Sequence, residues 1–276
     1  MNLLELTKIL EKAFAEDIGM GDLTSESIFS ADKNGTGVYT AKADGVLSGL
    51  EAIETGYRLL DPNVQINLLK RDGDTVEQGD KIGKVTGSIR TLLAGERVIL
   101  NLIQHLSGIA TSTQEVISLL DDPDITVTDT RKTLPGLRAL QKYAVQCGGG
   151  KNHRFRLDDG VMIKDNHIKA AGSISAAIEL VRKNCGHMVK IEVETENRAQ
   201  VEEAVAAKAD VIMLDNRTPE EVKELRKIIP AAIVVEASGG IIPQNIASYN
   251  NCGADVISLG WLTHSVKALD ISFNLK

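Results

Sequence analysis

Several features are scarce in this sequence, and each absence narrows the class of protein. Only three of the 276 residues are cysteines, Cys147, Cys185 and Cys252, and no two form a CxxC pair. We expect reduced structural thiols in a cytoplasmic protein. No apolar run approaches the length that spans a bilayer, so no membrane partner is expected. Residues 1–5 lead into an amphipathic pattern with acidic residues, which does not predict a signal peptide.

Excess positive charge is also missing. The net charge is −7, which argues against nucleic acid as the main partner. The charge is nevertheless uneven, because residues 131–164 hold eight basic residues against only Asp158 and Asp159, a net +6 that leaves −13 on the rest. A concentrated positive segment in an acidic chain favours a small, highly anionic ligand. A solvated basic face is the alternative, and it is the preferred interpretation for Lys142 and Arg156.

The second half of the chain alternates β-rich runs with helical patterns. Six candidate strands begin at residues 125, 161, 189, 211, 233 and 256, and helical patterns occupy residues 173–184, 197–208, 218–229 and 243–250. Strand and helix in alternation predict parallel strands with right-handed crossovers. In barrels of this kind the carboxyl ends of the strands carry the active site. We therefore expect the residues that follow these strands to lie together at an enzyme's active site.

The first half has a different pattern. The expected elements are helices at residues 2–17, 51–60, 91–106 and 109–120, and β-rich segments at residues 36–48 and 65–86. Eight strand–helix units usually need about 250 residues, and far fewer remain after residue 110. The sequence therefore predicts an α/β protein, with an N-terminal α/β sandwich domain at residues 1–110 and an incomplete, six-stranded α/β barrel at residues 111–276.

The basic residues at strand ends indicate the chemistry of the ligand. Arg131 and Lys132 directly follow a strand, and residues 148–150 are glycines that allow close backbone approach to a ligand before His153 and Arg154. The planar fork of arginine matches a carboxylate, whereas lysine acts as a point charge for phosphate. A site with several of each predicts a substrate that bears carboxylates and phosphates. For any single arginine, a surface ion pair is an equally good interpretation.

Two carboxylates at adjacent strand ends provide the opposite charge. Glu194 and Asp215 suit Mg²⁺ or the hydroxyls of a ribose, and the alternative is a structural ion pair with Lys164. Residues 238–240, Ser-Gly-Gly, lead toward Pro243, a favoured first residue of a helix whose N-terminus could receive a phosphate. His167 and His264 are interpreted as packing or supporting residues.

In this order, these strings resemble the quinolinate phosphoribosyltransferase family, whose members are also called nicotinate-nucleotide pyrophosphorylase (carboxylating). The most specific pieces are Asp129-Thr-Arg-Lys-Thr133 and Asn152-His-Arg154. The matching segments cover nearly the whole chain: residues 95–102, 105–111, 129–138, 142–145, 148–154, 163–167, 192–194, 214–216, 236–240 and 259–265. Trp261 departs from the pattern, because a small residue is expected beside the phosphate turn.

This resemblance implies a reaction and an assembly. The family joins quinolinate to phosphoribosyl pyrophosphate with decarboxylation, which gives nicotinate mononucleotide, pyrophosphate and CO₂ in de novo NAD biosynthesis. It implies a pentosyltransferase of the cytoplasm that uses Mg²⁺ and forms a homodimer, or a hexamer of dimers. Arg97 matches the arginine that reaches the active site of the partner subunit.

The resemblance also implies roles for individual residues. Lys132, Lys164, Glu194 and Asp215 match catalytic positions, and Glu194 and Asp215 are the expected Mg²⁺ side, directly or through water. Quinolinate is expected at Arg131, His153 and Arg154, with Lys132 and Lys164 nearby. The remaining substrate-binding positions are Arg97, Thr130, Ser238, Gly239, Gly240, Leu259 and Gly260.

Two other functions are compatible with parts of this pattern. A related paralogue found with molybdate transport genes shares the fold and much of the motif set, although the complete Asp129–Thr133 and Asn152–Arg154 strings favour quinolinate. A non-catalytic anion-binding descendant of the fold predicts loss of Glu194 or Asp215, and both are present.

Overall fold

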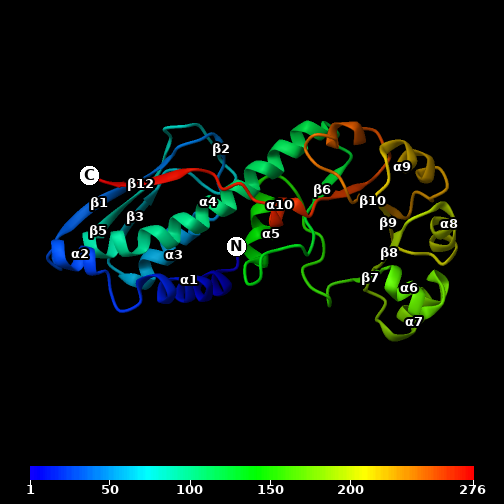
Figure 1. Cartoon of the computed structure of the whole chain (residues 1–276), viewed down its shortest axis with the longest axis horizontal. Coiled ribbons are helices and arrows are strands. Elements are labelled where there is room, and N and C mark those ends of the chain that lie inside the picture. The colour runs from blue at the N-terminus through cyan, green and yellow to red at the C-terminus, as the bar shows by residue number, and fades with distance from the viewer. The chain divides into compact units, whose positions relative to one another are not determined.

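The computed structural model describes all 276 residues, and the chain divides into two compact units (Figure 1). Unit 1 comprises Met1–Gln114, Thr133–Gly149 and Leu262–Lys276, and unit 2 comprises Glu115–Lys132 and Gly150–Trp261. Unit 1 therefore includes two segments that follow residue 110 in the sequence. The mixed α/β class with a six-stranded parallel sheet is confirmed.

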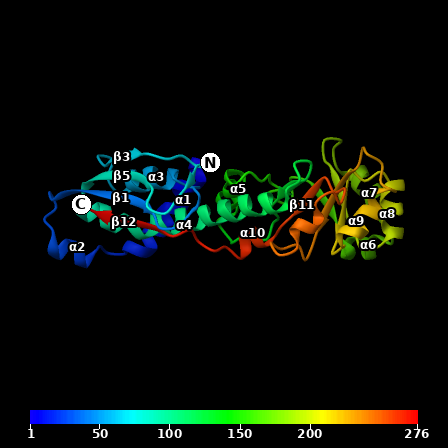
Figure 2. The ribbon, with the colours of Figure 1, turned by 90° about the horizontal axis from the view of Figure 1, so that it is seen from above.

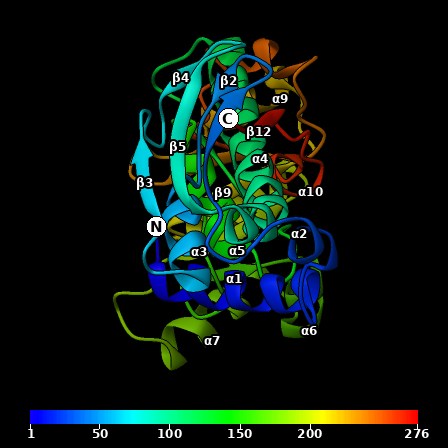
Figure 3. The same cartoon turned by 90° about the vertical axis from the view of Figure 1, so that its left-hand side faces the viewer.

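Unit 1 is built on a four-stranded antiparallel sheet in the order β12-β1-β5-β3 (Figure 2). Its strands are β1 (Asn34–Ala41), β3 (Gln65–Leu68), β5 (Lys81–Ser88) and β12 (Ile271–Leu275), and β2 (Gly45–Val46) pairs separately with β4 (Thr75–Val76). Its helices include α1 (Leu3–Ile18), α2 (Leu23–Ile28), α3 (Glu51–Leu60), α5 (Arg138–Cys147) and most of α4 (Ile89–Leu120). Helices α1, α3 and α4 gather on one face of the sheet (Figure 3).

Helix α1 shows how the local sequence produces this packing. The side chain of Asn2 caps the helix by accepting the backbone N–H groups of Leu4 and Glu5. Leu6, Leu10 and Phe14 recur at helical spacing and are buried. The helix therefore contributes an apolar face to the core of unit 1.

Helix α4 corrects the expectation of two helices separated at Ser107-Gly108. It runs without interruption over 32 residues. Ser107 is buried in it, and its hydroxyl accepts the Ser48 N–H at 3.0 Å. A Cβ on Gly108 would lie 2.2 Å from the carbonyl oxygen of Lys267. The small residues therefore permit close backbone packing rather than end the helix.

Unit 2 contains the parallel sheet, in the order β6-β11-β10-β9-β8-β7. Its strands are β6 (Thr126–Thr128), β7 (Val161–Ile163), β8 (Ile191–Thr195), β9 (Val211–Asp215), β10 (Val234–Ser238) and β11 (Val256–Ser258). The helices are α6 (Asp165–Ala171), α7 (Ile174–Asn184), α8 (Arg198–Ala206) and α9 (Pro219–Arg226), followed by a 3₁₀ turn (Ile246–Tyr249). Helix α10 (Trp261–His264) begins at the last residue of the unit and belongs mostly to unit 1. Ser173, Asn197 and Thr218 cap α7, α8 and α9, so the expected starts of these helices are confirmed.

The helix expected at residues 243–250 is wrong. Only Ile246–Tyr249 is helical, as a 3₁₀ turn. The Asn245 side chain accepts the N–H of Ile242 and donates to the carbonyl of Gly240, so it stabilises a local turn in place of a first helical turn. No α-helix N-terminus therefore faces the Ser238–Gly240 turn from this segment.

Candidate functional site

One face of the parallel sheet carries the polar residues expected in a site. Because successive strand side chains point to opposite faces, Glu192 and Glu194 of β8 share a face. The strand register places Asp215 of β9 and Glu236 and Ser238 of β10 on the same face, here called the inner face. The opposite, outer face is apolar and buried, with Val193, Ile212, Leu214, Val235, Ala237 and Ile257. The outer face of the sheet therefore packs against the rest of unit 2, and the inner face carries the polar candidate residues.

The carboxyl ends of β7, β8 and β9 bring together Lys164, Glu194 and Asp215. The Lys164 ammonium forms a hydrogen-bonded ion pair with the Glu194 carboxylate. Burial and the charge of Glu194 raise the pKa of Asp215, whose Oδ2 accepts the side-chain N–H of Asn216 at 2.6 Å. The ion pair with Lys164 that the sequence left as an alternative is therefore present, and Glu194 is its partner. Two neighbouring carboxylates with one lysine can hold a cation or ribose hydroxyls on an otherwise basic ligand site.

The turn after β10 has a structural need for glycine. Gly239 has φ +83°, and a Cβ there would lie 2.4 Å from the Asn216 Oδ1. The Ser258 hydroxyl donates to that of Ser238 at 2.9 Å. Trp261, the residue that departs from the family pattern, donates its indole N–H to the carbonyl of Ile241 at 3.0 Å. This bond fixes the chain beyond the turn.

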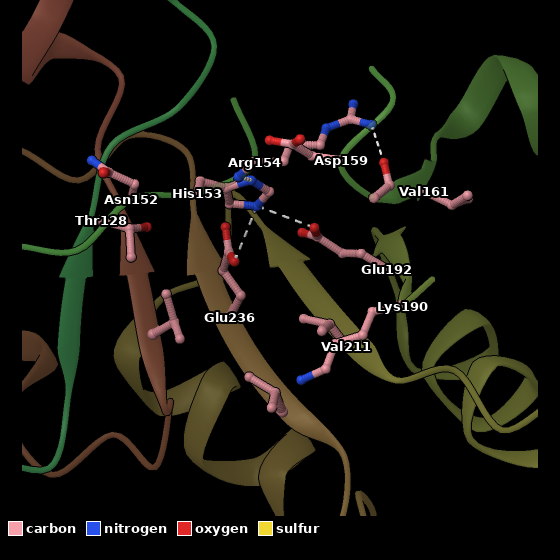
Figure 4. Close-up of a pocket in the computed structure, with 13 residues that line it drawn as sticks. Thr128, Asn152, His153, Arg154, Asp159, Val161, Lys190, Glu192, Val211 and Glu236 are labelled. Carbon is pink, nitrogen blue, oxygen red and sulfur yellow. Dashed lines mark hydrogen bonds and ion pairs between the residues drawn. The ribbon is translucent and has the colours of Figure 1, made fainter. Parts of the chain in front are cut away.

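Deeper on the inner face, three side chains form what we call the buried cluster: His153, Glu192 and Glu236 (Figure 4). His153 Nε2 lies 3.1 Å from Glu192 Oε2 and 3.5 Å from Glu236 Oε2. The carboxylates belong to β8 and β10, which are separated by β9. They line a cavity of about 350 Å³ with Thr128, Arg154 and other residues. The histidine therefore bridges two strands that are not neighbours.

Two features of this cluster indicate different protonation states for His153. Burial alone would lower the pKa of His153, but the hydrogen bonds and charges of Glu192 and Glu236 raise it to about 10, which favours an imidazolium. However, the backbone N–H of Arg154 donates to His153 Nδ1 at 2.8 Å, which requires that nitrogen to be unprotonated. An imidazolium and an unprotonated Nδ1 are incompatible. We assign the neutral ring, because an imidazolium would place its Nδ1–H against the N–H of Arg154.

The ring proton of His153 therefore lies on Nε2, between the carboxylates. Burial also raises the pKa of Glu192, so the carboxylate side of the cluster retains protons more readily than an exposed glutamate. An Nε2 that carries a proton has no lone pair for a metal. The closeness of the three side chains thus does not make His153 a metal ligand.

Two arginines in unit 2 lie near each other. Burial and the positive charge of Arg131 lower the pKa of Arg154. The Arg154 guanidinium donates to the carbonyl of Gly160 at 2.7 Å (Figure 4). Like charges held together are unfavourable without an anion, so this pair fits a site for a carboxylate-bearing ligand.

Asp129, at the end of β6, holds the segment that carries His153 and Arg154. Its side chain is fully buried and accepts the His153 backbone N–H at 3.0 Å and the Asn152 side-chain N–H at 2.6 Å. A parallel bridge between Thr128 and Lys151 places the same segment beside β6. The specific Asp129–Thr133 and Asn152–Arg154 strings are therefore connected directly in the fold.

The remaining site candidates of unit 2 follow β6 and β11. Thr130 Oγ1 accepts the backbone N–H of Lys132 at 3.0 Å, and the side chains of Arg131 and Lys132 are exposed. Leu259 is buried, and its N–H donates to the carbonyl of Thr128 at 2.9 Å. Gly260 follows Leu259 and is half-buried.

Two residues expected to lie near a ligand, Arg97 and Gly148, belong to unit 1, and so does Lys142, which was expected on a solvated face. Arg97 is exposed on α4. Lys142 is fully buried in α5, so its assignment to a solvated basic face is wrong, whereas Arg156 of unit 2 is exposed and pairs with Asp158 at 3.3 Å. A Cβ on Gly148 would lie 2.3 Å from the carbonyl of Ala110, so this glycine serves backbone packing against α4.

The other histidines and the cysteines have local roles. His167 Nδ1 accepts the backbone N–H of Lys164 at 3.0 Å, and His264 Nδ1 lies 2.7 Å from the Ser265 hydroxyl, in agreement with supporting roles. His105 Nε2 lies 2.8 Å from the Gln141 amide nitrogen. None of the three cysteines forms a disulfide.

Asp129, Glu192 and Glu236 were not among the residues expected from the sequence. A signal for two of them was present, because each stands two residues before an expected site residue on the same strand, Glu192 before Glu194 and Glu236 before Ser238. Strand alternation places such pairs on one face. The location of the imidazole between them could not be read from that spacing.

Comparisons with known proteins agree with the resemblance in the motifs. The family models that match are "Quinolinate phosphoribosyl transferase, N-terminal domain" over residues 22–107 and the corresponding C-terminal domain over residues 109–274. A probable nicotinate-nucleotide pyrophosphorylase [carboxylating] of Bacillus subtilis is 54% identical over 100% of this chain and 95% of its own length. A mitochondrial quinolinate phosphoribosyltransferase [decarboxylating] of Nicotiana tabacum is 37% identical over 98% and 82%.

Solved structures extend this likeness to the whole fold. The crystal structure of NadC from Streptococcus pyogenes has a TM-score of 0.97 at 40% identity and covers 100% of this chain and 98% of that one. The nicotinate-nucleotide pyrophosphorylase of Francisella tularensis has a TM-score of 0.94 at 36% identity, with the same coverage. No helix of this chain combines the length and apolar character needed to cross a membrane.

Proposed function

Because this chain belongs to the quinolinate phosphoribosyltransferase family, we propose that it transfers the phosphoribosyl group of phosphoribosyl pyrophosphate to quinolinate. The products are nicotinate mononucleotide, pyrophosphate and CO₂, a step of NAD biosynthesis. The observation that carries this proposal is the sheet edge that presents Lys164, Glu194 and Asp215. Arg154, whose pKa is lowered by burial and by the positive charge of Arg131, supplies the complementary cationic side. A dicarboxylate would satisfy the arginines, and the ribose and its phosphates would meet the sheet edge.

The quinolinate carboxylates are proposed to bind at Arg131, His153 and Arg154, with Lys132 and Lys164 nearby. Bidentate contacts with two arginines would fix the pyridine ring and direct its nitrogen toward C1 of the ribose. The ring nitrogen has an available lone pair, so no general base is needed to begin the reaction. The positive charge that then forms on the ring nitrogen stabilises the electrons left behind when the adjacent carboxylate departs as CO₂.

The leaving pyrophosphate and the ribose define the other half of the site. Positive charge builds on the ribose as the bond from C1 to pyrophosphate breaks, and Glu194 and Asp215 can stabilise it. Lys132 and Lys164 would neutralise the departing pyrophosphate. Thr130 and the turn at Ser238, Gly239 and Gly240, with Leu259 and Gly260 on the next strand, are proposed to bind phosphate through backbone and hydroxyl groups.

Mg²⁺ is the proposed cofactor. Glu194 and Asp215 fit this ion because both offer carboxylate oxygens, the ligands that it prefers, and because the charge of Glu194 raises the pKa of Asp215, a repulsion that a cation relieves. When bound, Mg²⁺ would supply additional neutralisation of the pyrophosphate charge. Calorimetry of phosphoribosyl pyrophosphate with and without Mg²⁺ checks this: equal affinities would contradict it.

We further propose a cytoplasmic homodimer, with a hexamer of dimers as its higher form, in which Arg97 completes the partner's site. Arg97 is exposed on α4 of unit 1, and no strand end of the parallel sheet carries it. Subunits with Arg97→Ala and subunits with Arg131→Ala should each be nearly inactive. After subunit exchange, mixed dimers should regain activity toward half of wild type at one intact site. Exchange shown by mass spectrometry without regained activity would contradict the role of Arg97.

The direct test of the proposed function is a product assay. The purified protein is incubated with quinolinate, phosphoribosyl pyrophosphate and Mg²⁺, and nicotinate mononucleotide and CO₂ are measured. Formation of both in equal amounts is expected. Arg131→Ala should weaken quinolinate binding by roughly 2–5 kcal/mol, the usual loss when one partner of a buried charge pair is removed, and affect phosphoribosyl pyrophosphate much less. Absence of product from the wild-type protein would reject the function.

A further inference from the structure

The buried cluster has a feature that substrate binding alone does not explain. Glu192 and Glu236 are 7% and 3% exposed, and each has one carboxylate oxygen, Oε1, that is buried without a hydrogen-bond partner. The other oxygen of each lies within 3.5 Å of His153 Nε2. Burial of a carboxylate is unfavourable unless hydrogen bonds compensate for lost water. Two such groups directed at a single imidazole are therefore a poor device for stability.

We propose that Glu192 and Glu236 are positioning residues for the substrate dicarboxylate, because they fix the His153 ring, which in turn fixes the backbone at Arg154. The first link is the pair of contacts from Nε2 at 3.1 and 3.5 Å. The second link is the hydrogen bond from the Arg154 N–H to His153 Nδ1 at 2.8 Å. Both ring nitrogens are thus used, and the ring is a connector between the strands and Arg154.

The His153 ring lies in the segment from Lys151 to Val161, which is otherwise anchored at its two ends. Lys151 is bridged to Thr128 of β6, and Val161 begins β7 at the opposite edge of the sheet. Between them, the buried cluster ties the segment to β8 and β10 in the middle of the sheet. Asp129 adds a hold on the His153 backbone N–H. The middle of the segment is therefore fixed by carboxylates from three different strand positions.

Arg154 is the residue that this arrangement orients. Its backbone is held by the imidazole and its guanidinium by the carbonyl of Gly160 at 2.7 Å. A fork-shaped cation must approach a carboxylate in its plane, so small rotations of the arginine weaken a bidentate contact. The inference rests on the proposed function, since it names what holds the proposed dicarboxylate-binding arginine in place.

The test uses Glu192→Met, Glu236→Met and the double variant. Methionine has a similar volume, and replacement of buried ionic groups by apolar residues is often neutral or stabilising. We expect an unchanged or higher Tm. The KM for quinolinate should rise about tenfold to a hundredfold, the range that small misplacement of a binding group produces. The KM for phosphoribosyl pyrophosphate should stay within about twofold, because its proposed ligands lie elsewhere on the sheet edge. Glu192→Gln and Glu236→Gln keep an acceptor for Nε2–H and should retain a KM near wild type.

Asp255→Asn provides the matched control. Asp255 Oδ2 accepts the N–H of Val235, the residue before Glu236, at 2.7 Å, so it supports the same part of β10 without being a member of the buried cluster. This variant should lower Tm and leave the KM for quinolinate unchanged, the opposite pattern. Equal rises of both KM values in the methionine variants, or a quinolinate KM that does not move, would overturn the inference.

A measurement without turnover covers the case in which the methionine variants do not fold. In nitrogen NMR of histidine-labelled wild-type protein, the ring signals that are absent from the spectrum of His153→Gln belong to His153, and they should show protonated Nε2 and unprotonated Nδ1. An Nδ1-protonated ring would overturn the inference. If the wild-type protein makes no nicotinate mononucleotide, the proposed function fails, and the NMR result still decides whether the connector exists.

Discussion

Unit 1 and unit 2 differ in the charged side chains that they bury. The core of unit 1 is apolar around Tyr39 and Tyr57, whose hydroxyls lie 3.0 Å apart, and its only buried charged residue is Lys142. The three buried carboxylates of the protein, Asp129, Glu192 and Glu236, all belong to unit 2. This difference indicates that the interior of unit 1 mainly stabilises the fold by apolar packing. The interior of unit 2 also contains a region of buried carboxylates.

The contrast continues within the parallel sheet. Its outer face buries aliphatic residues such as Val193, Ile212 and Val235, and burial of apolar surface stabilises a protein by roughly 25 cal/mol per Å². Its inner face buries carboxylates, each of which costs several kcal/mol before compensation, by general estimates. The outer face therefore supplies stability that the inner face lacks. Substitutions can test this division because they should affect either stability or activity.

The largest expected effect is on the apolar side of the comparison. Ile53 of α3 is fully buried in the core of unit 1. Ile53→Ala leaves a cavity and should lower the free energy of unfolding by about 2–5 kcal/mol. Denaturant unfolding measures this change. The kcat of the protein that remains folded should match wild type, and a kcat that falls with stability would break the separation of packing from chemistry.

The next effect is on the charged side. Lys164→Ala removes the partner of Glu194 and a proposed neutralising charge for pyrophosphate. The kcat should fall about a hundredfold to a thousandfold, as for other preorganised electrostatic groups. Lys169→Ala is the control, because Lys169 forms an exposed pair with Asp165 at 3.3 Å on α6, the next helix. If both variants lose activity equally, general loss of positive charge explains the result and the assignment of Lys164 is wrong.

A smaller effect tests the buried hydroxyl contacts of Tyr57 in unit 1. The Tyr57 hydroxyl lies 3.0 Å from the Tyr39 hydroxyl and donates to the carbonyl of Leu92 at 3.1 Å. Tyr57→Phe should reduce the free energy of unfolding by about 1 kcal/mol, the usual net value of a hydrogen bond. Thermal unfolding detects it, and no change would mean that these hydroxyls contribute nothing to the core.

The smallest effect is expected on the surface of unit 2. Arg198 and Glu202 pair at 2.8 Å on α8, with side chains 65% and 55% exposed. Glu202→Gln should change the free energy of unfolding by only about 0.3–0.5 kcal/mol, with less change at high salt. Denaturant unfolding in low and high salt measures this change. A loss above 1 kcal/mol would show that exposed ion pairs on the outer helices contribute substantially to the stability of unit 2.

Much of the fold was predictable because its signals are local. The alternation of strand and helix patterns predicted the parallel sheet and its helices, and in the structure Ser173, Asn197 and Thr218 cap three of these helices at the expected starts. The C-terminal strand β12 was missed because it exists through antiparallel pairing with the distant β1. The helix break expected at Gly108 was wrong. The glycine permits close packing against the carbonyl oxygen of Lys267, which lies more than 100 residues later in the sequence.

The candidate site was predictable to a similar degree. Lys164, Glu194, Asp215 and Ser238 could be placed at strand ends from the sequence pattern, and the structure brings them to one sheet edge. The buried cluster could not, because its formation depends on where the segment before β7 crosses the sheet. Motifs identify which residues share an edge, but the direction of one imidazole is decided by tertiary packing.

The most direct test of the account is a comparison of quinolinate with nicotinate as the acceptor acid. Nicotinate lacks the second carboxylate, so part of the charge of Arg131 and Arg154 would remain uncompensated. Sites built around polar partners reject analogues that lack them, and we expect kcat/KM for nicotinate to be at least about a hundredfold lower. The measurement is nicotinate mononucleotide formed from each acid with phosphoribosyl pyrophosphate and Mg²⁺. Comparable kcat/KM values for the two acids would contradict the claim that the inner face of unit 2 is organised around a dicarboxylate.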